Sequence, residues 1–114
     1  MNWKVVFIPE AEKDFSTLDG SAKRLVQKAL MKVSTNPLPD YEGGYGKPLG
    51  NHAKTKLAGL LKIKLKTSGI RVVYKLIRTD TQMLIVVIGA GADDEVYETA
   101  QKRISGKALD FLTN

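Results

Sequence analysis

Residues 61–76 read LKIKLKTSGIRVVYKL, and this stretch predicts a β-hairpin around which the rest of the chain is organised. Apolar and basic residues alternate through its first half, and successive side chains of a strand point to opposite faces. One face of the hairpin should therefore be apolar and pack on a core, while the other should be basic. The residues expected on the basic face are Lys62, Lys64, Lys66, Arg71 and Lys75.

The turn of this hairpin sets which residues lie opposite one another. A two-residue turn at Ser68-Gly69 keeps each apolar residue opposite another apolar residue, whereas a three-residue turn would mix the two faces. The pairs expected on the basic face are Lys66 with Arg71, Lys64 with Val73, and Lys62 with Lys75. Like charges placed opposite each other destabilise a sheet by up to about 1 kcal/mol per pair. We therefore expect a polyanion, most simply a nucleic acid, to bind this face.

Further elements are predicted on both sides of the hairpin. Strands are expected over residues 3–8, 60–66, 70–78 and 82–88, and helices from Pro9 to Leu18, from an N-cap at Ser21 to Val33, and from about residue 93 to 104. The order is that of an α+β domain with an N-terminal strand, a two-helix hairpin, a three-stranded antiparallel meander with helices on one side, and a C-terminal helix. Residues 36–50 carry so many Pro and Gly residues that no regular structure is expected there. A loop of that length is usually functional or mobile.

Length and charge limit the possible functions. The chain has 114 residues and a formal net charge of +6, and we expect a single domain over residues 1–104 followed by a tail over residues 105–114. From Lys54 to Arg78 there are Lys and Arg residues but no Asp or Glu. Such a block predicts an anionic partner, either a nucleic acid or an acidic protein.

The composition also excludes several classes of site. The absence of cysteine excludes disulfides, thiolate metal sites and cysteine nucleophiles. The N-terminus lacks the pattern of a signal peptide, and the most apolar segment, residues 83–92, is far shorter than the ~20 residues that cross a bilayer. We expect a cytoplasmic protein that does not associate with membranes.

A basic sheet face offers part of the chemistry of RNA cleavage. Without a metal ion, the reaction needs a base for the ribose 2′-hydroxyl, stabilisation of the charge that grows on the phosphate, and a proton for the leaving oxygen. Clustered cations stabilise the growing charge, and neighbouring positive charges lower the pKa of a lysine so that it can act as a base. No His, Asp or Glu lies on the predicted face. The residues are therefore compatible with a nuclease but do not require one.

The hairpin, together with Lys47-Pro48-Leu49 before it and Gly89 and Glu95-Val96-Tyr97 after it, resembles the RelE branch of the RelE/ParE toxins. The resemblance extends to about Ile104. It implies a small ribonuclease that enters the ribosome, cuts messenger RNA without a cofactor, and is neutralised by a RelB-like antitoxin with an acidic and apolar contact surface. The roles it implies are general base for Lys64, binding of the scissile phosphate for Lys62 and Arg71, and stacking on a base for Tyr97. The remaining cations expected to bind RNA are Lys47, Lys54, Lys56, Lys66, Lys75 and Arg78.

One position departs from the RelE pattern and keeps other functions open. Gly91 stands about where RelE-type enzymes carry an arginine that assists the transition state, and Arg78, Arg103 or a lysine of residues 47–56 would have to replace it. The alternatives are a ParE-type inhibitor of DNA gyrase and a non-catalytic module that binds RNA or an antitoxin. The matching lysines, arginine and tyrosine favour the ribonuclease. Tyr41 and Tyr45 could stack on RNA bases, although tyrosines in loops more often cover an edge of the core.

Overall fold

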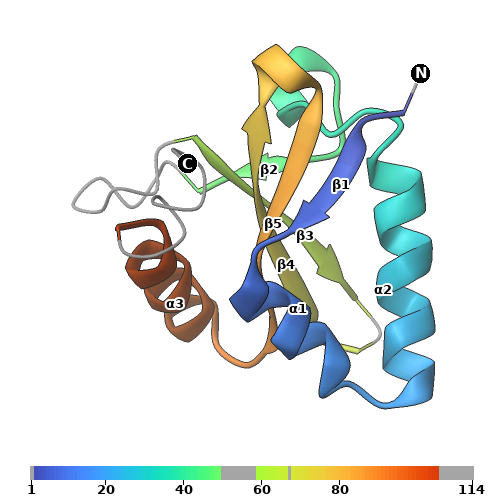
Figure 1. The fold of residues 1–114 in the computed structure, drawn as a ribbon, viewed down its shortest axis with the longest axis vertical. Coiled ribbons are helices and arrows are strands. Elements are labelled where there is room, and N and C mark those ends of the chain that lie inside the picture. Colours follow the sequence, from blue (N-terminus) through green and yellow to red (C-terminus); the bar gives the residue numbers. More distant parts are fainter. Residues whose placement is uncertain (1, 50–58, 67, 106–114) are drawn as a thin grey trace.

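A five-stranded sheet with helices against both faces forms the framework of the molecule (Figure 1). The computed structural model describes residues 2–49, 59–66 and 68–105. The strands are β1 (Lys4–Phe7), β2 (Lys47–Pro48), β3 (Leu60–Leu65), β4 (Ile70–Ile77) and β5 (Gln82–Ala90). The helices are α1 (Pro9–Ser16), α2 (Gly20–Val33) and α3 (Asp93–Ser105), with short 3-10 helices η1 (Asp40–Glu42) and η2 (Arg78–Asp80). The predicted α+β class and the order of the main elements are confirmed. Of the tail predicted over residues 105–114, Ser105 is the last residue of α3, and residues 106–114 lie outside the described residues.

The strand order is β1-β5-β4-β3-β2, which makes β5 and β4 the centre of the sheet. β3, β4 and β5 form the predicted antiparallel meander, β1 lies parallel to β5, and β2 adds an antiparallel edge that the sequence did not predict. The residues of β5 from Met83 to Ile88 are all buried, because neighbouring strands and helices enclose them. The core therefore lies on both sides of β5.

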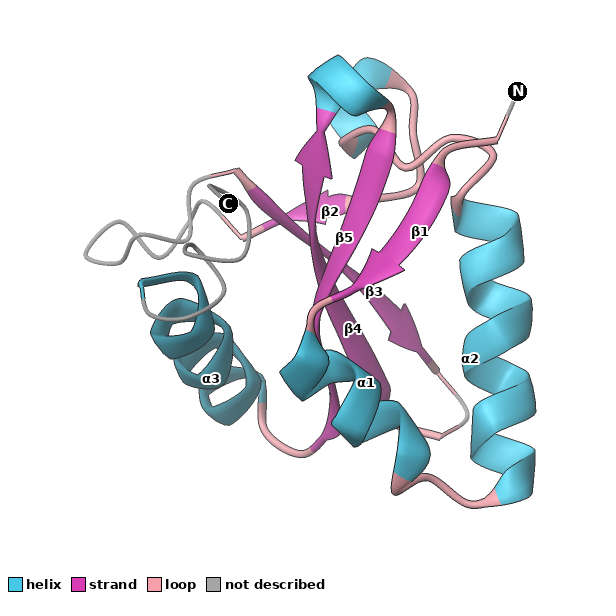
Figure 2. Ribbon diagram, viewed as in Figure 1, coloured by secondary structure: helices cyan, strands magenta, loops and turns pink. Residues whose placement is uncertain are grey.

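Helices cover both faces of the sheet, so the prediction of helices on one side was wrong (Figure 2). α1 and α2 pack on the face that carries Ile63 and Val72, while α3 packs on the opposite face, which also carries the lysines of β3. The reason is visible in the β4–β5 pair Val73 and Val87, which lies on the lysine-bearing face and is almost completely buried. A valine pair on a face otherwise rich in cations requires an apolar cover, and α3 supplies it with Val96.

The hairpin between β3 and β4 has a longer turn than predicted. Leu65 pairs with Ile70, which leaves residues 66–69 as the connection, and Gly69 has a φ of +72°. The observed pairs on the basic face are Lys64 with Arg71, Lys62 with Val73, and Leu60 with Lys75. The shift by two residues keeps every side chain on its predicted face, since side chains alternate with a period of two. The predicted pairing of Lys62 with Lys75 is wrong, and the like charges that lie opposite each other are Lys64 with Arg71 and Lys47 with Lys62.

The loop between α2 and β3 is more ordered than its composition suggested. It contains η1, β2 and an isolated bridge between Pro39 and Gly46, so the prediction of no regular structure was wrong. The backbone of Asp40 donates to the Gly46 carbonyl over 2.7 Å, and Gly46 donates to the Leu38 carbonyl over 3.1 Å. A Cβ on Gly44 would lie 2.1 Å from the Leu38 carbonyl oxygen, so only glycine allows the two backbone segments to approach.

The start of α2 also differs from its prediction. Asp19, not Ser21, is the N-cap, and its Oδ1 accepts hydrogen bonds from the Ala22 amide at 2.8 Å and from the Ser21 hydroxyl at 3.0 Å. Both hydrogen bonds lower the pKa of the Asp19 carboxyl, and the bond from the Ala22 amide has the larger effect. Aspartate and serine are both good caps, so the sequence alone did not distinguish two neighbouring candidates.

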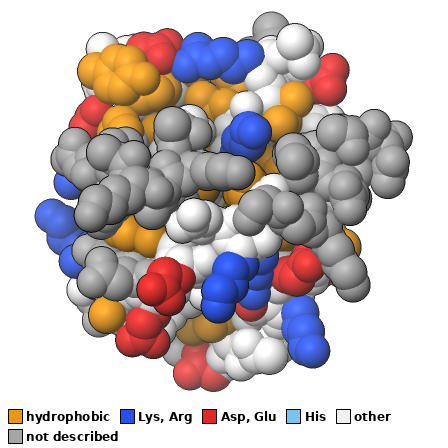
Figure 3. Space-filling model, turned by 90° about the vertical axis from the view of Figure 1, so that its left-hand side faces the viewer, with side chains coloured by type: hydrophobic (Ala, Val, Ile, Leu, Met, Phe, Trp, Pro, Cys, Tyr) orange, Lys and Arg blue, Asp and Glu red, His pale blue; other side chains and the backbone are white. Residues whose placement is uncertain are grey.

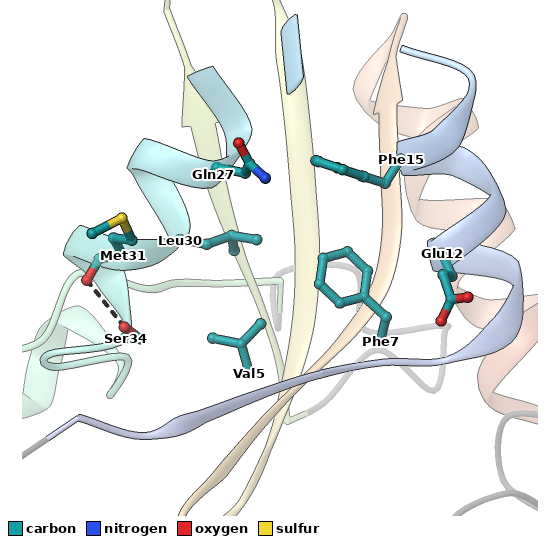
Figure 4. A pocket seen from close by; sticks show the side chains of 8 residues that line it. All are labelled: Val5, Phe7, Glu12, Phe15, Gln27, Leu30, Met31 and Ser34. Atoms are coloured by element: carbon teal, nitrogen blue, oxygen red, sulfur yellow. Dashed lines mark hydrogen bonds between the residues drawn. The ribbon is translucent and has the colours of Figure 1, made fainter. Parts of the chain in front are cut away.

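An apolar groove lies between α1 and α2, the two helices of the predicted hairpin (Figure 4). The groove has a volume of about 590 Å³. Val5 and Phe7 of β1 form its floor, Phe15 of α1 one wall, and Leu30 and Met31 of α2 the other. The Phe7 and Phe15 rings meet edge to face with centroids 5.9 Å apart.

In the described part of the chain, no helix is long and apolar enough to span a bilayer.

Candidate active site

Lys62 and Tyr97 join the basic sheet face to α3. The Lys62 Nζ donates to the Tyr97 hydroxyl over 2.5 Å and lies 5.2 Å from the centroid of the tyrosine ring. Tyr97 is only 4% exposed and Lys62 is partly buried. The tyrosine therefore orients the lysine, and in this arrangement its ring is covered. The predicted stacking of Tyr97 on a base stays a prediction, and it requires the ring to be uncovered first.

Arg71 and Lys64 lie directly opposite each other on β4 and β3. Lys64 is exposed, whereas Arg71 is partly buried and reaches toward the connection between β5 and α3. The Arg71 Nη1 donates to the Gly69 carbonyl at 3.0 Å and to the Gly91 carbonyl. These contacts hold the guanidinium against the Gly69 and Gly91 carbonyls, at the end of the sheet face on which Lys64 also lies.

The other predicted RNA-binding residues divide into two groups. Lys47 lies opposite Lys62 on the edge strand β2, and Lys75 lies opposite Leu60, so both share the sheet face with Lys62 and Lys64. Lys66 is exposed in the turn, beyond the end of β3. Figure 3 shows this side of the molecule, where basic side chains reach the surface at several separate places. Lys54 and Lys56 lie outside the described residues.

Arg78 has an acidic partner that the sequence did not indicate. Its guanidinium donates to both carboxylate oxygens of Glu42, at 3.1 and 2.7 Å, and so ties η2 to η1. The pair raises the pKa of Arg78 and lowers that of Glu42, mainly through these hydrogen bonds. The run of basic residues up to Arg78 has no acid within it, yet an acid from the preceding loop partly neutralises its last member.

Comparison with known proteins identifies the family. No family model matches the sequence. A putative RelE-like toxin protein of Escherichia coli is 31% identical over 109 residues, which cover 91% of this chain and 99% of that protein. The chain belongs to the RelE-like toxins. The mRNA interferase toxin RelE of Escherichia coli strain K12 is 29% identical over 98 residues, which cover 86% of this chain and 93% of that protein.

Solved structures agree with the fold of this RelE-like toxin. A free double arginine-to-alanine mutant of the E. coli toxin RelE matches with a TM-score of 0.69 and 26% identity, covering 91% of this chain and 99% of that one. The same kind of mutant in complex with a peptide of its antitoxin RelB matches with a TM-score of 0.61 and 26% identity, covering 91% and 99% of the two chains. The confirmed resemblance therefore extends over nearly the whole length of both proteins.

Two arginines proposed from the sequence to replace the one missing at Gly91 are engaged elsewhere in this RelE-like toxin. Arg103 donates to both carboxylate oxygens of Asp14, at 2.7 and 3.2 Å, and to the Val86 carbonyl at 2.8 Å. Asp14 also accepts a hydrogen bond from the Ile88 amide at 3.0 Å, so this pair links α1, β5 and α3. Arg78 is held by Glu42. Among the described candidates, Lys47 is the cation that lies beside Lys62.

Sequence reasoning missed three contacts at this site. The hydrogen bond between Lys62 and Tyr97, the contact of Arg71 with the Gly91 carbonyl, and the pair of Asp14 with Arg103 all join residues that are far apart in the chain. The one available signal was Val73, an apolar residue within the basic strand that could have indicated an apolar cover on this face. In the described ranges, no three His, Asp or Glu side chains gather as a metal site would require.

Proposed function

We propose that this RelE-like toxin is an endoribonuclease that cuts messenger RNA on the ribosome without a metal ion. The observation that carries the proposal is the placement of Lys62, Lys64 and Arg71 on one sheet face, with Tyr97 of α3 against it. The relative named mRNA interferase toxin RelE supports the same activity. The arrangement brings several cations together on the face where a phosphate would bind.

The proposed reaction assigns one task to each residue. Lys64 acts as the general base and takes the proton from a ribose 2′-hydroxyl, and the oxygen attacks the adjacent phosphorus. Lys62 and Arg71 donate hydrogen bonds to the phosphate oxygens as their negative charge grows. The bond to the 5′-oxygen then breaks, and this oxygen takes a proton from a water molecule, to which Lys64 returns the proton that it accepted. The products are one fragment with a 2′,3′-cyclic phosphate and one with a 5′-hydroxyl. Tyr97 acts through Lys62, whose ammonium group it orients.

Lys47 replaces, in this proposal, the arginine that is missing near Gly91. It lies opposite Lys62 at the edge of the sheet and is exposed, so it can approach a phosphate bound there. A lysine supplies charge but not the two parallel hydrogen bonds of a guanidinium. We therefore expect this toxin to cleave more slowly than a relative that has the arginine.

The proposed protein partner is a RelB-like antitoxin with acidic and apolar residues. The intact E. coli RelBE complex has been solved, and so has a complex of the E. coli toxin with an antitoxin peptide. An acidic segment would neutralise the face that carries Lys47, Lys62 and Lys64 and so compete with RNA.

One expression experiment tests the proposed activity. The toxin is induced briefly in cells, new 5′ ends of messenger RNA are mapped, and plasmid supercoiling is followed in the same samples. Cuts within codons that disappear in Lys64→Ala are the expected result. Altered supercoiling without new 5′ ends would indicate a gyrase inhibitor, and no change in either would indicate a binding module. The missing arginine is the observation that favours the binding module as the second candidate.

A further inference from the structure

The loop between α2 and β3 presents an exposed aromatic side chain from a well-ordered backbone. Tyr41 lies in η1 and is 77% exposed, more than any other aromatic side chain in the described ranges. Hydrogen bonds hold the backbone on both sides of it: Glu42 donates to Pro39, Gly43 to Asp40, and Gly44 to Pro39, all at 2.9–3.0 Å. The pair of Glu42 and Arg78 fixes the loop to the end of β4. An ordered loop that leaves a tyrosine ring in solvent does not use that ring to cover the core.

A cleft of about 420 Å³ lies beside this tyrosine. It is formed where β3 begins and β4 ends, and the side chains that matter here are Pro39, Tyr41, Pro48, Lys75, Ile77 and Arg78. Proline and tyrosine rings form apolar parts of its lining, and Lys75 and Arg78 are its cations, of which Arg78 is paired with Glu42. Apolar rings beside a cation are suited to a nucleobase and its phosphate.

Lys75 belongs both to the lining of the cleft and to the basic face of the candidate active site. Lys75 lies two residues along β4 from Val73, which is the partner of Lys62, and two residues of a strand span about 6.6 Å. Both residues point to the same face of β4, because side chains alternate. A single strand of RNA bound at Lys62 and Lys64 can therefore extend along β4 toward the cleft.

We propose that this cleft binds one unstacked nucleotide of the RNA that flanks the cut phosphate. The Tyr41 ring stacks on the base and Lys75 binds the phosphate of that nucleotide. Glu42 does not repel the phosphate, because its carboxylate is paired with Arg78. The inference rests on the proposed ribonuclease function, and it adds a nucleotide site to the residues that act on the scissile phosphate.

The same loop contains a matched control residue. Tyr45 is 47% exposed, but its ring lies 5.3 Å from the Nζ of Lys32 on α2 and does not line the cleft. Replacement of Tyr45 by alanine removes an exposed tyrosine from the same loop without removing the proposed platform. Replacement of Tyr41 by phenylalanine keeps the stacking ring and removes only its hydroxyl.

Cleavage of messages on programmed ribosomes tests the inference. Tyr41→Ala should lower kcat/KM about tenfold, mainly through KM, because stacking of one base on an aromatic ring contributes about a tenfold change or more in binding. Tyr41→Phe should restore most of the loss, and Tyr45→Ala should cleave like the wild type. A message with an abasic nucleotide at the flanking position should be a poor substrate for the wild type, and Tyr41→Ala should cleave it no worse than the intact message.

Two results would overturn the inference. The first is wild-type cleavage by Tyr41→Ala, and if the antitoxin also neutralises this variant more weakly, the ring is a protein contact. The second is a defect in Tyr45→Ala equal to that in Tyr41→Ala. If the wild type cuts no message, the proposed function fails, and NMR titration of the protein with a six-nucleotide single-stranded RNA decides the inference. Shifts of the Tyr41 ring signals that vanish with an abasic probe would then support it, and their absence would overturn it.

Discussion

The Tyr97 hydroxyl accepts a hydrogen bond from Lys62, which connects a helix near the end of the chain to the centre of the basic sheet face. Tyr97→Phe keeps the buried ring but removes this acceptor, so we expect it to lower kcat on programmed ribosomes about tenfold, as for loss of one hydrogen bond to a charged group. If Tyr97 served only as a stacking platform, Tyr97→Phe would leave kcat unchanged, because phenylalanine stacks as well as tyrosine. Unchanged kcat and KM in Tyr97→Phe would therefore exclude the positioning role.

Lys64 and Arg71 are like charges that lie opposite each other, so activity and stability should respond to mutation in opposite directions. Lys64→Ala should abolish toxicity and leave the free energy of unfolding unchanged or raise it by up to about 1 kcal/mol. Growth after induction and urea denaturation measure the two effects. Lys28→Ala, which removes an exposed lysine from α2, is the control and should change neither. A marked loss of stability in Lys64→Ala would mean that the lysine is structural.

Lys62 and Arg71 should be as sensitive as Lys64 in the toxicity assay. Lys62→Ala and Arg71→Ala each remove a proposed phosphate ligand, and we expect each to lower cleavage about a hundredfold while the fold is kept. Circular dichroism and thermal melting verify the fold. If Lys62→Ala and Arg71→Ala are as toxic to cells as the wild type, the assignment of the sheet face fails.

Asp14 and Arg103 make an ion pair that serves the fold and not the reaction. Both side chains are about one-fifth exposed, and the carboxylate also accepts the Ile88 amide. Arg103→Ala should lower the free energy of unfolding by about 2 kcal/mol, because it leaves a partly buried carboxylate without its charged partner. Cleavage per folded molecule should not change. Lys102→Ala on the same helix is the control, and a double-mutant cycle with Asp14→Asn isolates the pair.

The arginine missing near Gly91 can be tested by restoring it. Gly91 has a φ of +140°, so Gly91→Arg strains the backbone even though the space around it is open. Ala92→Arg, at an exposed position with ordinary backbone, should instead raise codon cleavage by up to roughly a hundredfold, since one preorganised donor contributes ~3 kcal/mol. Lys47→Ala should then lower cleavage by the natural toxin but leave cleavage by Ala92→Arg unchanged. Equal sensitivity in both backgrounds would show that Lys47 does not fill this role.

The sequence predicted those parts of the fold that depend on alternation. The strands β3, β4 and β5 and the side on which Lys62 and Lys64 lie follow from a period of two. The register between β3 and β4 did not follow, because turns of two and four residues preserve the same faces. The difference depends on the conformation of Gly69, whose positive φ is not visible in the residue type alone.

The loop and the helix α3 were less predictable for a different reason. Proline and glycine in residues 36–49 excluded long helices and strands, but the bond from Asp40 to Gly46 depends on how two backbone segments meet. For α3, periodicity indicated a helix but not the face on which it packs. The three cations of the candidate site were therefore predictable from the sequence, whereas the contact with Tyr97 needed the tertiary structure.

The parallel pairing of β1 with β5 also affects when the toxin can be completed during its synthesis. Lys4 pairs with Gln82, so the first strand must wait while the intervening chain is made. Tyr97 emerges later still, after 93 further residues have followed Lys4. At about 5 to 20 residues per second, that interval lasts roughly 5 to 20 s. A nascent toxin therefore has no assembled site for most of its own translation, and an antitoxin already present in the cell can bind the sheet as soon as it forms.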